Sequence, residues 1–246
     1  MKTQIFIKQT YTIFNMKTVI MAGGLGKRLK PLTCVIPKPL LPLGEKTILE
    51  CTINKLKEHD FKEIILATNF QSELFEAYLK DGSHLGVNLE YSKEEKPLGT
   101  VGPLSLLKEK IGKEPFIIIN GDILTNLNFK DLMNFHINNN ADITVTVKEI
   151  ETPFQYGIIH SKNDHLVDLE EKPNLKSDIL AGIYVFNPEM LNYLENNKPK
   201  LMTDFIRDLL NHGKKVRVYR IKEYWLDIGL MENYQKAQED KENGFI

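Results

Sequence analysis

The segment AGGLGKRLKPLT, residues 22–33, places three glycines and three basic side chains directly after a short apolar run. A glycine-rich turn between a strand and a helix leaves backbone N–H groups free to hold phosphate, and the helix N-terminus adds a positive potential. Arg28 can clamp two phosphate oxygens at once through its guanidinium. We therefore expect this turn to wrap a nucleoside triphosphate with the following residues: Ala22, Gly23, Gly24, Gly26, Lys27 and Arg28.

Two well-known phosphate-binding motifs do not fit this loop. The P-loop requires Gly-Lys followed by Ser or Thr, but Gly26-Lys27 is followed by Arg28. The dinucleotide fingerprint G-x-G-x-x-G begins at Gly24 and Gly26, but its third glycine position is Leu29. The alternative for the loop alone is a glycine turn beside solvated charges.

Three further charged residues stand where chemistry with phosphates would need them. Lys38 lies between two prolines, which stiffen the backbone and fix the direction of the ammonium group. Asp122 ends the apolar segment PFIIINGD, and Asp227 lies in WLDIG. Magnesium prefers one or two carboxylates together with phosphate oxygens and water, so these aspartates are candidate metal ligands. The alternatives are a turn or capping role for Asp122 and a surface ion pair for Asp227.

The net charge, the number of cysteines and the lengths of the apolar runs exclude several other functions. The formal net charge of −1 gives no global positive field for nucleic acid. Two cysteines form no disulfide framework or zinc spacing, which favours a reducing cytoplasm. No apolar run approaches the roughly 20 residues that a membrane span needs. Residues 1–15 lack the continuous apolar core of a signal peptide, and we interpret them as an N-terminal extension ahead of one domain at 16–246.

The elements that must position these residues alternate between strand and helix. Apolar runs ending in turn residues predict strands at 17–22, 61–70, 87–94, 115–122 and 141–150. Helical spacing predicts helices at 48–60, 71–82, 104–112, 129–140, 201–213 and 231–243. Short strands are expected at 156–160, 166–173, 181–187 and 214–221. This order predicts a Rossmann-like α/β/α fold with a mixed, mostly parallel sheet and no C-terminal left-handed β-helix.

Several motifs together carry a resemblance to a known family. The segment MAGGLGKRLKPLT…PKPLLPLG resembles the sugar-1-phosphate nucleotidylyltransferases. Further motifs match in order over about residues 16–240: KPLGTVGPL (96–104), INGD (119–122), YGII (156–159), EEKP (170–173), AGIYVF (181–186) and YWLDIG (224–229). Lys27 departs from the family, which usually has Thr there, and this leaves its phosphate contact open.

The resemblance implies a reaction and a set of roles. Such enzymes join a nucleoside triphosphate to a sugar 1-phosphate and release pyrophosphate and a nucleotide sugar. It implies Mg²⁺ on Asp122 and Asp227, catalytic roles for Arg28, Lys38 and Asp122, and nucleotide contacts at Gly99, Thr100 and Gly121. It places Gly157, Glu171, Lys172 and Gly182 at the sugar phosphate, with a solvated charge run as the alternative for Glu171 and Lys172.

The sequence determines the nucleotide base, the sugar 1-phosphate and the oligomeric state less closely than the type of reaction. The run EEKPLGTVGPLSLLKEK resembles guanylyltransferases of mannose 1-phosphate, which favours GTP. Heptose and hexosamine 1-phosphates, and thymidylyl, uridylyl or cytidylyl transfer, remain alternatives, as does a catalytically silent regulatory homologue. The resemblance further implies a cytoplasmic enzyme of surface glycan synthesis, without nucleic-acid or membrane partners, that forms a homodimer or homotetramer.

Overall fold

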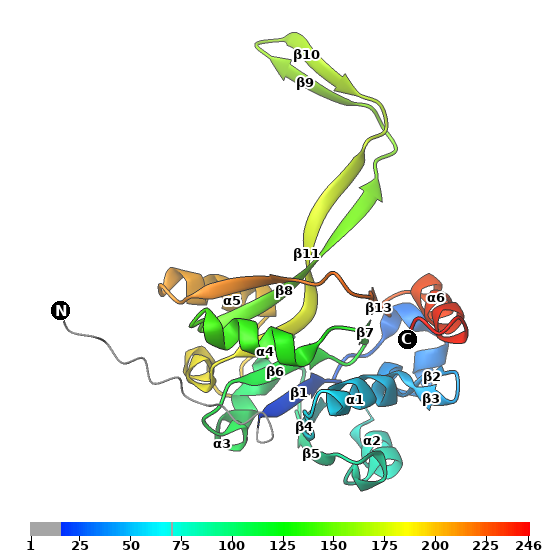
Figure 1. Ribbon diagram of the computed structural model, residues 1–246, viewed down its shortest axis with the longest axis vertical. Helices are drawn as coiled ribbons and strands as arrows, with labels where there is room; N and C mark the ends of the chain where they lie inside the picture. The colour runs from blue at the N-terminus through cyan, green and yellow to red at the C-terminus, as the bar shows by residue number, and fades with distance from the viewer. Residues whose placement is uncertain (1–15, 70) are drawn as a thin grey trace, which may run out of the picture.

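The structure is a computed structural model that describes residues 16–69 and 71–246. The predicted N-terminal extension, residues 1–15, lies outside the described residues. A seven-stranded sheet forms the centre of the molecule (Figure 1). From edge to edge its strands are β12 (Val216–Arg220), β8 (Ile143–Pro153), β11 (Asn174–Phe186), β6 (Phe116–Asn120), β1 (Lys17–Met21), β4 (Glu63–Thr68) and β5 (Asn88–Lys93).

The direction of these strands confirms the predicted α/β fold with a mixed, mostly parallel sheet. Strand β11 is antiparallel to both of its neighbours, whereas every other neighbouring pair is parallel. Three small sheets pair β2 (Pro42–Leu43) with β3 (Lys46–Thr47), β7 (Ile123–Thr125) with β13 (Trp225–Asp227), and β9 (Ile158–Lys162) with β10 (His165–Glu170). The described residues contain no left-handed β-helix.

Helices cover both faces of the sheet. The α-helices are α1 (Ile48–Glu58), α2 (Ser72–Leu79), α3 (Lys108–Ile111), α4 (Phe129–Asn138), α5 (Met202–Asn211) and α6 (Met231–Glu242). Short 3₁₀ helices are η2 (Lys27–Leu29), η3 (Leu32–Cys34), η4 (Lys38–Leu40), η5 (Ser83–Leu85), η6 (Gly102–Leu107) and η7 (Pro188–Tyr193). Among the described helices, none is both long and apolar enough to cross a bilayer.

Side chains alternate between the two faces of the central sheet along each strand, and this alternation produces one hydrophobic core on each face. In β1, Ile20 packs in the core that includes side chains of α1, α2 and α4, whereas its neighbour Val19 packs in the core that includes α3 and α5. Adjacent strand residues point to opposite faces, and both faces of a largely parallel sheet are normally covered. The result is the predicted three-layer arrangement.

The predicted helix at 104–112 differs from the structure. Residues Gly102–Leu107 form η6, and only Lys108–Ile111 is α-helical. Gly102 packs so tightly that a Cβ there would lie 2.8 Å from the carbonyl oxygen of Lys198. Close tertiary packing therefore sets the path of this segment against its helical propensity.

The largest departure from expectation is a long arm, defined here as residues 148–180. The outer part of β8 and the first part of β11 leave the sheet as one antiparallel ribbon, and β9 and β10 form its tip, far from the helices (Figure 1). Its residues are exposed almost throughout. The short strand expected at 181–187 is the end of this much longer strand β11.

Candidate active site

The glycine loop follows β1 at the carboxyl edge of the sheet. Gly26 has a φ of 58°, and a Cβ there would lie 2.8 Å from Thr33 Cγ2, so this position requires glycine. Thr33 Oγ1 donates a 2.8 Å hydrogen bond to the Gly26 carbonyl and holds the turn. At Gly24, a Cβ would find no described atom within 4 Å, so the backbone there borders open space. The loop backbone at Gly24 therefore faces open space, at the position where the sequence predicts contacts with a nucleotide.

Parallel pairing brings a second segment beside this loop. Met21 at the end of β1 is the register partner of Asn120 at the end of β6. The Gly121 N–H donates a 2.9 Å hydrogen bond to the Met21 carbonyl, and Asp122 follows directly. Lys38 forms an ion pair with the Asp122 carboxylate, and both side chains are largely buried. The predicted cation and the predicted carboxylate thus meet at the carboxyl edge of the sheet.

Strands β7 and β13 bring in the other aspartate. Asp227 is the register partner of Ile123, the residue after Asp122. Burial raises the pKa of Asp227, the nearby Asp122 carboxylate raises it further, and Lys38 and Arg28 lower it. Arg28 packs on the same turn, because its Nη2 lies 2.9 Å from the position that a Cβ on Gly229 would take. The four charged groups of the predicted site therefore converge from distant parts of the chain.

The donor set at this point fits a divalent cation. Asp227 Oδ1 is buried and has no hydrogen-bond partner among the described residues. An unpaired buried carboxylate oxygen is costly, and a metal ion would satisfy it. The described residues hold no group of three or more acidic, histidine or cysteine ligands. Two carboxylates with substrate phosphates and water are what magnesium uses in such sites, so Asp122 and Asp227 fit this ion.

A cavity of about 470 Å³ extends from this acidic end along the glycine loop. It is lined by Met21–Lys27, Lys38, Pro39, Ala67, Asn69, Glu94, Pro97, Gly99, Thr100, Pro103 and Asn120–Asp122. Its volume suits a small-molecule ligand such as a nucleotide. Most of the residues predicted to bind a nucleotide therefore line one cavity.

Gly99 and Thr100 form the far wall through contacts with the segment before α5. Gly99 has a φ of 79°, and a Cβ there would lie 2.6 Å from the Lys200 carbonyl oxygen. The Thr100 hydroxyl accepts a 2.7 Å hydrogen bond from the Met202 N–H at the start of α5. Both residues therefore shape the wall, and the Thr100 hydroxyl is already engaged in the structure.

Glu94 is a cavity residue that sequence reasoning missed. It is 7% exposed, and its Oε2 accepts a 2.8 Å hydrogen bond from the Leu98 N–H. Burial raises the pKa of Glu94, whereas hydrogen bonds from Leu98 and Asn69 lower it. Its Oε1 lies 2.7 Å from where a Cβ on Gly23 would stand, so the carboxylate sits against the glycine loop. Glu94 precedes Glu95-Lys96 and is typical, in sequence, of a solvated charged run.

The residues predicted at the sugar phosphate are divided between the base of the arm and the arm itself, and none of them lines the described cavity. Gly182 lies at the base of the arm, where a Cβ would come within 2.8 Å of Asn120 Nδ2. Gly157, Glu171 and Lys172 lie where the tip of the arm joins β8 and β11, and they are exposed. No arm residue lines the described cavity. Within one chain, the structure therefore does not bring these three residues to the aspartates.

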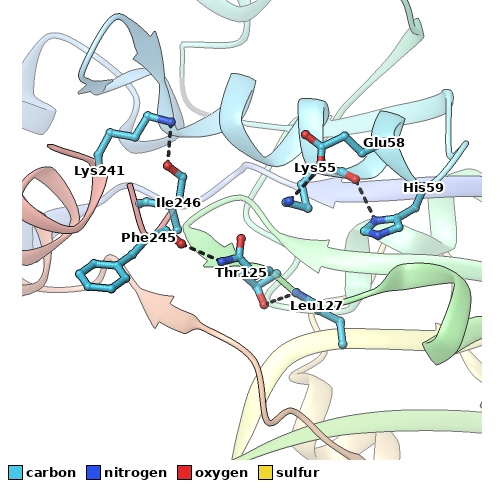
Figure 2. A network of polar contacts seen from close by, with 9 residues as sticks. Lys55, Glu58, His59, Thr125, Leu127, Lys241, Phe245 and Ile246 are labelled. Atoms are coloured by element: carbon cyan, nitrogen blue, oxygen red, sulfur yellow. Dashed lines mark hydrogen bonds and ion pairs between the residues drawn. The ribbon is translucent and has the colours of Figure 1, made fainter. Parts of the chain in front are cut away.

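A second, smaller cavity of about 120 Å³ lies among α1, β7 and the last residues of the chain. Figure 2 shows the contacts there: Lys241 Nζ donates to the Ile246 oxygen at 3.0 Å, and the Phe245 carbonyl faces the Thr125 segment. The Asn126 amide donates to that carbonyl at 2.7 Å. None of the predicted site residues lines this cavity. Its contacts instead fasten the end of the chain to β7, which carries one side of the acidic pair.

Comparisons with known proteins agree with this geometry. The family model described as nucleotidyl transferase matches residues 17–244. A protein of Oryza sativa subsp. japonica named "Probable mannose-1-phosphate guanylyltransferase 1" is 35% identical over 228 residues, 89% of this chain and 63% of its own length. The mannose-1-phosphate guanylyltransferase catalytic subunit beta of Drosophila melanogaster is 34% identical over 89% of this chain and 60% of its own.

A solved structure is similar over nearly the whole of both chains. The HddC protein of Yersinia pseudotuberculosis, complexed with GMP-PN, has a TM-score of 0.74 and 25% identity, covering 92% of this chain and 99% of that one. In contrast, this chain spans less than two thirds of the length of the rice and Drosophila proteins.

Proposed function

This chain belongs to the nucleotidyl transferase family, and we propose that it transfers a nucleoside monophosphate from GTP to a sugar 1-phosphate of the mannose type. One observation carries the proposal. Asp122 and Lys38 line one end of a cavity that the glycine loop borders, and Arg28 and Asp227, whose buried Oδ1 is unpartnered among the described residues, lie beside them. Transfer of a nucleotidyl group between phosphates requires cationic groups and metal-binding carboxylates that are positioned around the reacting phosphates.

The proposed reaction balances without a strong base. A phosphate oxygen of the sugar 1-phosphate attacks the α-phosphorus of the triphosphate, and the bond from that phosphorus to the bridging oxygen breaks. Pyrophosphate leaves with the electron pair of that bond. Since the attacking oxygen is already anionic, the protein has to position the reactants and neutralise charge, not remove a proton.

Individual side chains fit separate parts of this task. Asp122 and Asp227 would hold Mg²⁺, which supplies positive charge to the phosphates when bound. Arg28 and the glycine loop would hold the leaving pyrophosphate, because guanidinium and backbone N–H groups both donate to phosphate oxygens. Lys38, held beside Asp122, would face the phosphate at which transfer takes place.

Glu94 supports the choice of guanine. Its carboxylate is buried in the wall of the cavity at the glycine loop. Guanine presents adjacent N–H donors at N1 and N2, which a carboxylate can accept together. Uracil and thymine present one N–H donor between carbonyl oxygens, which a carboxylate would repel. The names of the rice and Drosophila relatives point to the same base and to mannose 1-phosphate.

The test is pyrophosphate release in Mg²⁺ with ATP, CTP, GTP, UTP or dTTP, each with mannose, heptose or hexosamine 1-phosphate. We expect release that requires both partners and is fastest with GTP and mannose 1-phosphate. A different preferred base would overturn the assignment to Glu94 and leave the reaction class standing. An absence of release with every pair would overturn the proposed reaction.

A further inference from the structure

The arm poses a structural problem that one copy of the chain does not solve. Its exposed large apolar side chains are Phe154, Tyr156, Ile159, Leu166, Val167, Leu169, Leu175 and Leu180. Ile159 and Leu169 are cross-strand partners, so they form an apolar pair on one face of the tip. A two-stranded ribbon is marginally stable in water unless something packs on it. The arm therefore requires a surface to cover these side chains.

The lower part of the arm is held away from its own cavity, and the tip turns to one side above it (Figure 1). Successive register pairs run from Asn174 with Pro153 to Leu180 with Val147. Lys176 forms a 2.8 Å ion pair with Glu151 across the ribbon, and Arg220 of β12 pairs with Asp178. Asn174 precedes Gly182 by eight residues, and extended strand of that length spans roughly 26 Å. This ladder would have to break before residues 153 and 174 could fold back onto the sheet.

A complementary surface surrounds the cavity. Leu25, Leu32, Val35 and Ile36, here called the mouth patch, are exposed by 45%, 37%, 69% and 39%. All four belong to the segment that carries the glycine loop and Arg28, and Leu25 lines the cavity itself. Exposed apolar side chains gathered at one place are typical of a contact surface. The mouth patch therefore offers the arm an apolar surface beside the anion site.

The bend between the ladder and the tip carries the charge that such a contact would bring to the other copy. Lys172 has a φ of 41°, a left-handed conformation that is strained for a residue with a side chain. It directly follows Glu170 and Glu171 in the turn that leads into β11. Strain of this kind is commonly kept where a side chain must be aimed. An ammonium group at this bend fits a second anion, the phosphate of the sugar.

We propose that two copies of this chain exchange arms, so that Glu171 and Lys172 of one copy complete the sugar-phosphate end of the other copy's cavity. The inference rests on the proposed function. The arm leaves the sheet beside Asn120, at the edge where the cavity opens. A twofold axis near that edge places each tip against the mouth patch of the other copy, and one such exchange closes a symmetric dimer.

The decisive test combines a defect in the body with a defect in the arm. Asp122→Asn and Lys172→Ala are expressed with different tags, and dimers that contain one of each are isolated by both tags. Exchange leaves one of the two sites with an intact body and an intact arm, so these dimers should recover about half of wild-type activity while each variant alone is inactive. The matched control combines Asp122→Asn with Asp227→Asn, and neither of its sites should recover. If the dimers of Asp122→Asn with Lys172→Ala were no more active than either variant alone, the proposed exchange of arms would be overturned.

A second measurement needs no activity, so it separates the failure of the exchange from the failure of the proposed reaction. Leu169→Asp places a charge on the arm tip, and Leu210→Asp places one on an equally exposed position of α5, at 54% and 53% exposure. In analytical ultracentrifugation we expect a wild-type dimer, a monomer for Leu169→Asp and a dimer for Leu210→Asp. A wild-type monomer at micromolar concentration, or an unchanged dimer in Leu169→Asp, would overturn the proposal.

Discussion

The backbone N–H of Ile228 donates a 2.9 Å hydrogen bond to the carbonyl oxygen of Asp122. With the register of β7 and β13, this bond holds the residues beside Asp227 and Asp122 on one backbone ladder. The Asn233 side chain adds a 2.7 Å hydrogen bond to the Asp227 carbonyl. Backbone contacts therefore position both acids, and substitutions of their carboxylates can be interpreted as changes of charge.

Replacement of Asp227 by Asn should separate activity from stability. We expect kcat for pyrophosphate release to fall by on the order of 10² or more, because the variant loses an anionic ligand of the proposed Mg²⁺, which would supply positive charge to the phosphates. In EDTA the variant should melt at a higher temperature than wild type, because an unpartnered buried carboxylate oxygen beside another carboxylate has been removed. Steady-state kinetics and calorimetry measure the two effects.

The control for this prediction is Asp204→Asn, which removes an exposed carboxylate that forms a 3.1 Å ion pair with Arg207. An exposed pair contributes little, so both its kcat and its melting temperature should stay near wild type. A normal rate with Asp227→Asn would remove this residue from the metal site.

Replacement of Glu94 by Gln should weaken the preference for guanine. Hydrogen bonds to a charged group contribute about 1.5–3 kcal/mol, so kcat/KM for GTP should fall by roughly 10- to 10²-fold. The kcat/KM for ATP should change far less. The adjacent exposed residue supplies the control, since Glu95→Gln should leave both values unchanged. Equal losses for GTP and ATP would make Glu94 a structural residue of the wall.

Two glycines with similar φ values allow the steric role of Gly99 to be isolated. Gly99 and Gly112 have φ values of 79° and 86°, but of the two only Gly99 would bring a Cβ against a carbonyl oxygen, at 2.6 Å. Alanine at either position should cost about 1–3 kcal/mol for its positive φ. Gly99→Ala should lose a further 1–3 kcal/mol or so from overpacking and should raise the KM for GTP. Urea unfolding of both variants tests this, and equal losses would show that the wall can move.

Stability should fall in mild acid because of His136. This ring is 1% exposed and lies 2.9 Å from Thr144 Oγ1 and 3.1 Å from Asn187 Oδ1. Burial lowers its pKa below the usual value of about 6.5, although the Asn187 contact opposes this. Because the unfolded state binds the proton more readily, its contribution is complete above about pH 6.5 and is lost as the pH falls towards the folded pKa.

Unfolding free energies between pH 7.5 and 5 measure this loss. His136→Gln should flatten the dependence, whereas His84→Gln, at an exposed position, should preserve it. A wild-type curve as flat as that of His136→Gln would contradict a proton-linked role for this ring.

Much of the fold could be predicted from residue types, whereas most roles in the candidate site came from motifs that resemble a known family. The apolar segments 17–22 and 115–122 were predicted as strands, and the structure places them side by side. Glu94 could not be found this way, because only the packing of the chain separates a buried carboxylate from the exposed Glu95 beside it. The arm was missed because a strand that continues beyond the sheet has the same alternation as a separate short strand.

The fastening of the last residues to β7 has a consequence for synthesis on the ribosome. All strands of the central sheet precede residue 221, whereas Asp227 belongs to β13 and depends on contacts made by α6 and the C-terminal residues. Tyr224 donates a 2.7 Å hydrogen bond to Asp240 of α6, and Asn126 of the loop after β7 binds the Phe245 carbonyl. Emerging chains can thus assemble their hydrophobic layers before the acidic pair exists. A nascent chain would therefore acquire its shape first, and the acidic pair of the candidate site only once residues beyond 221 have been added.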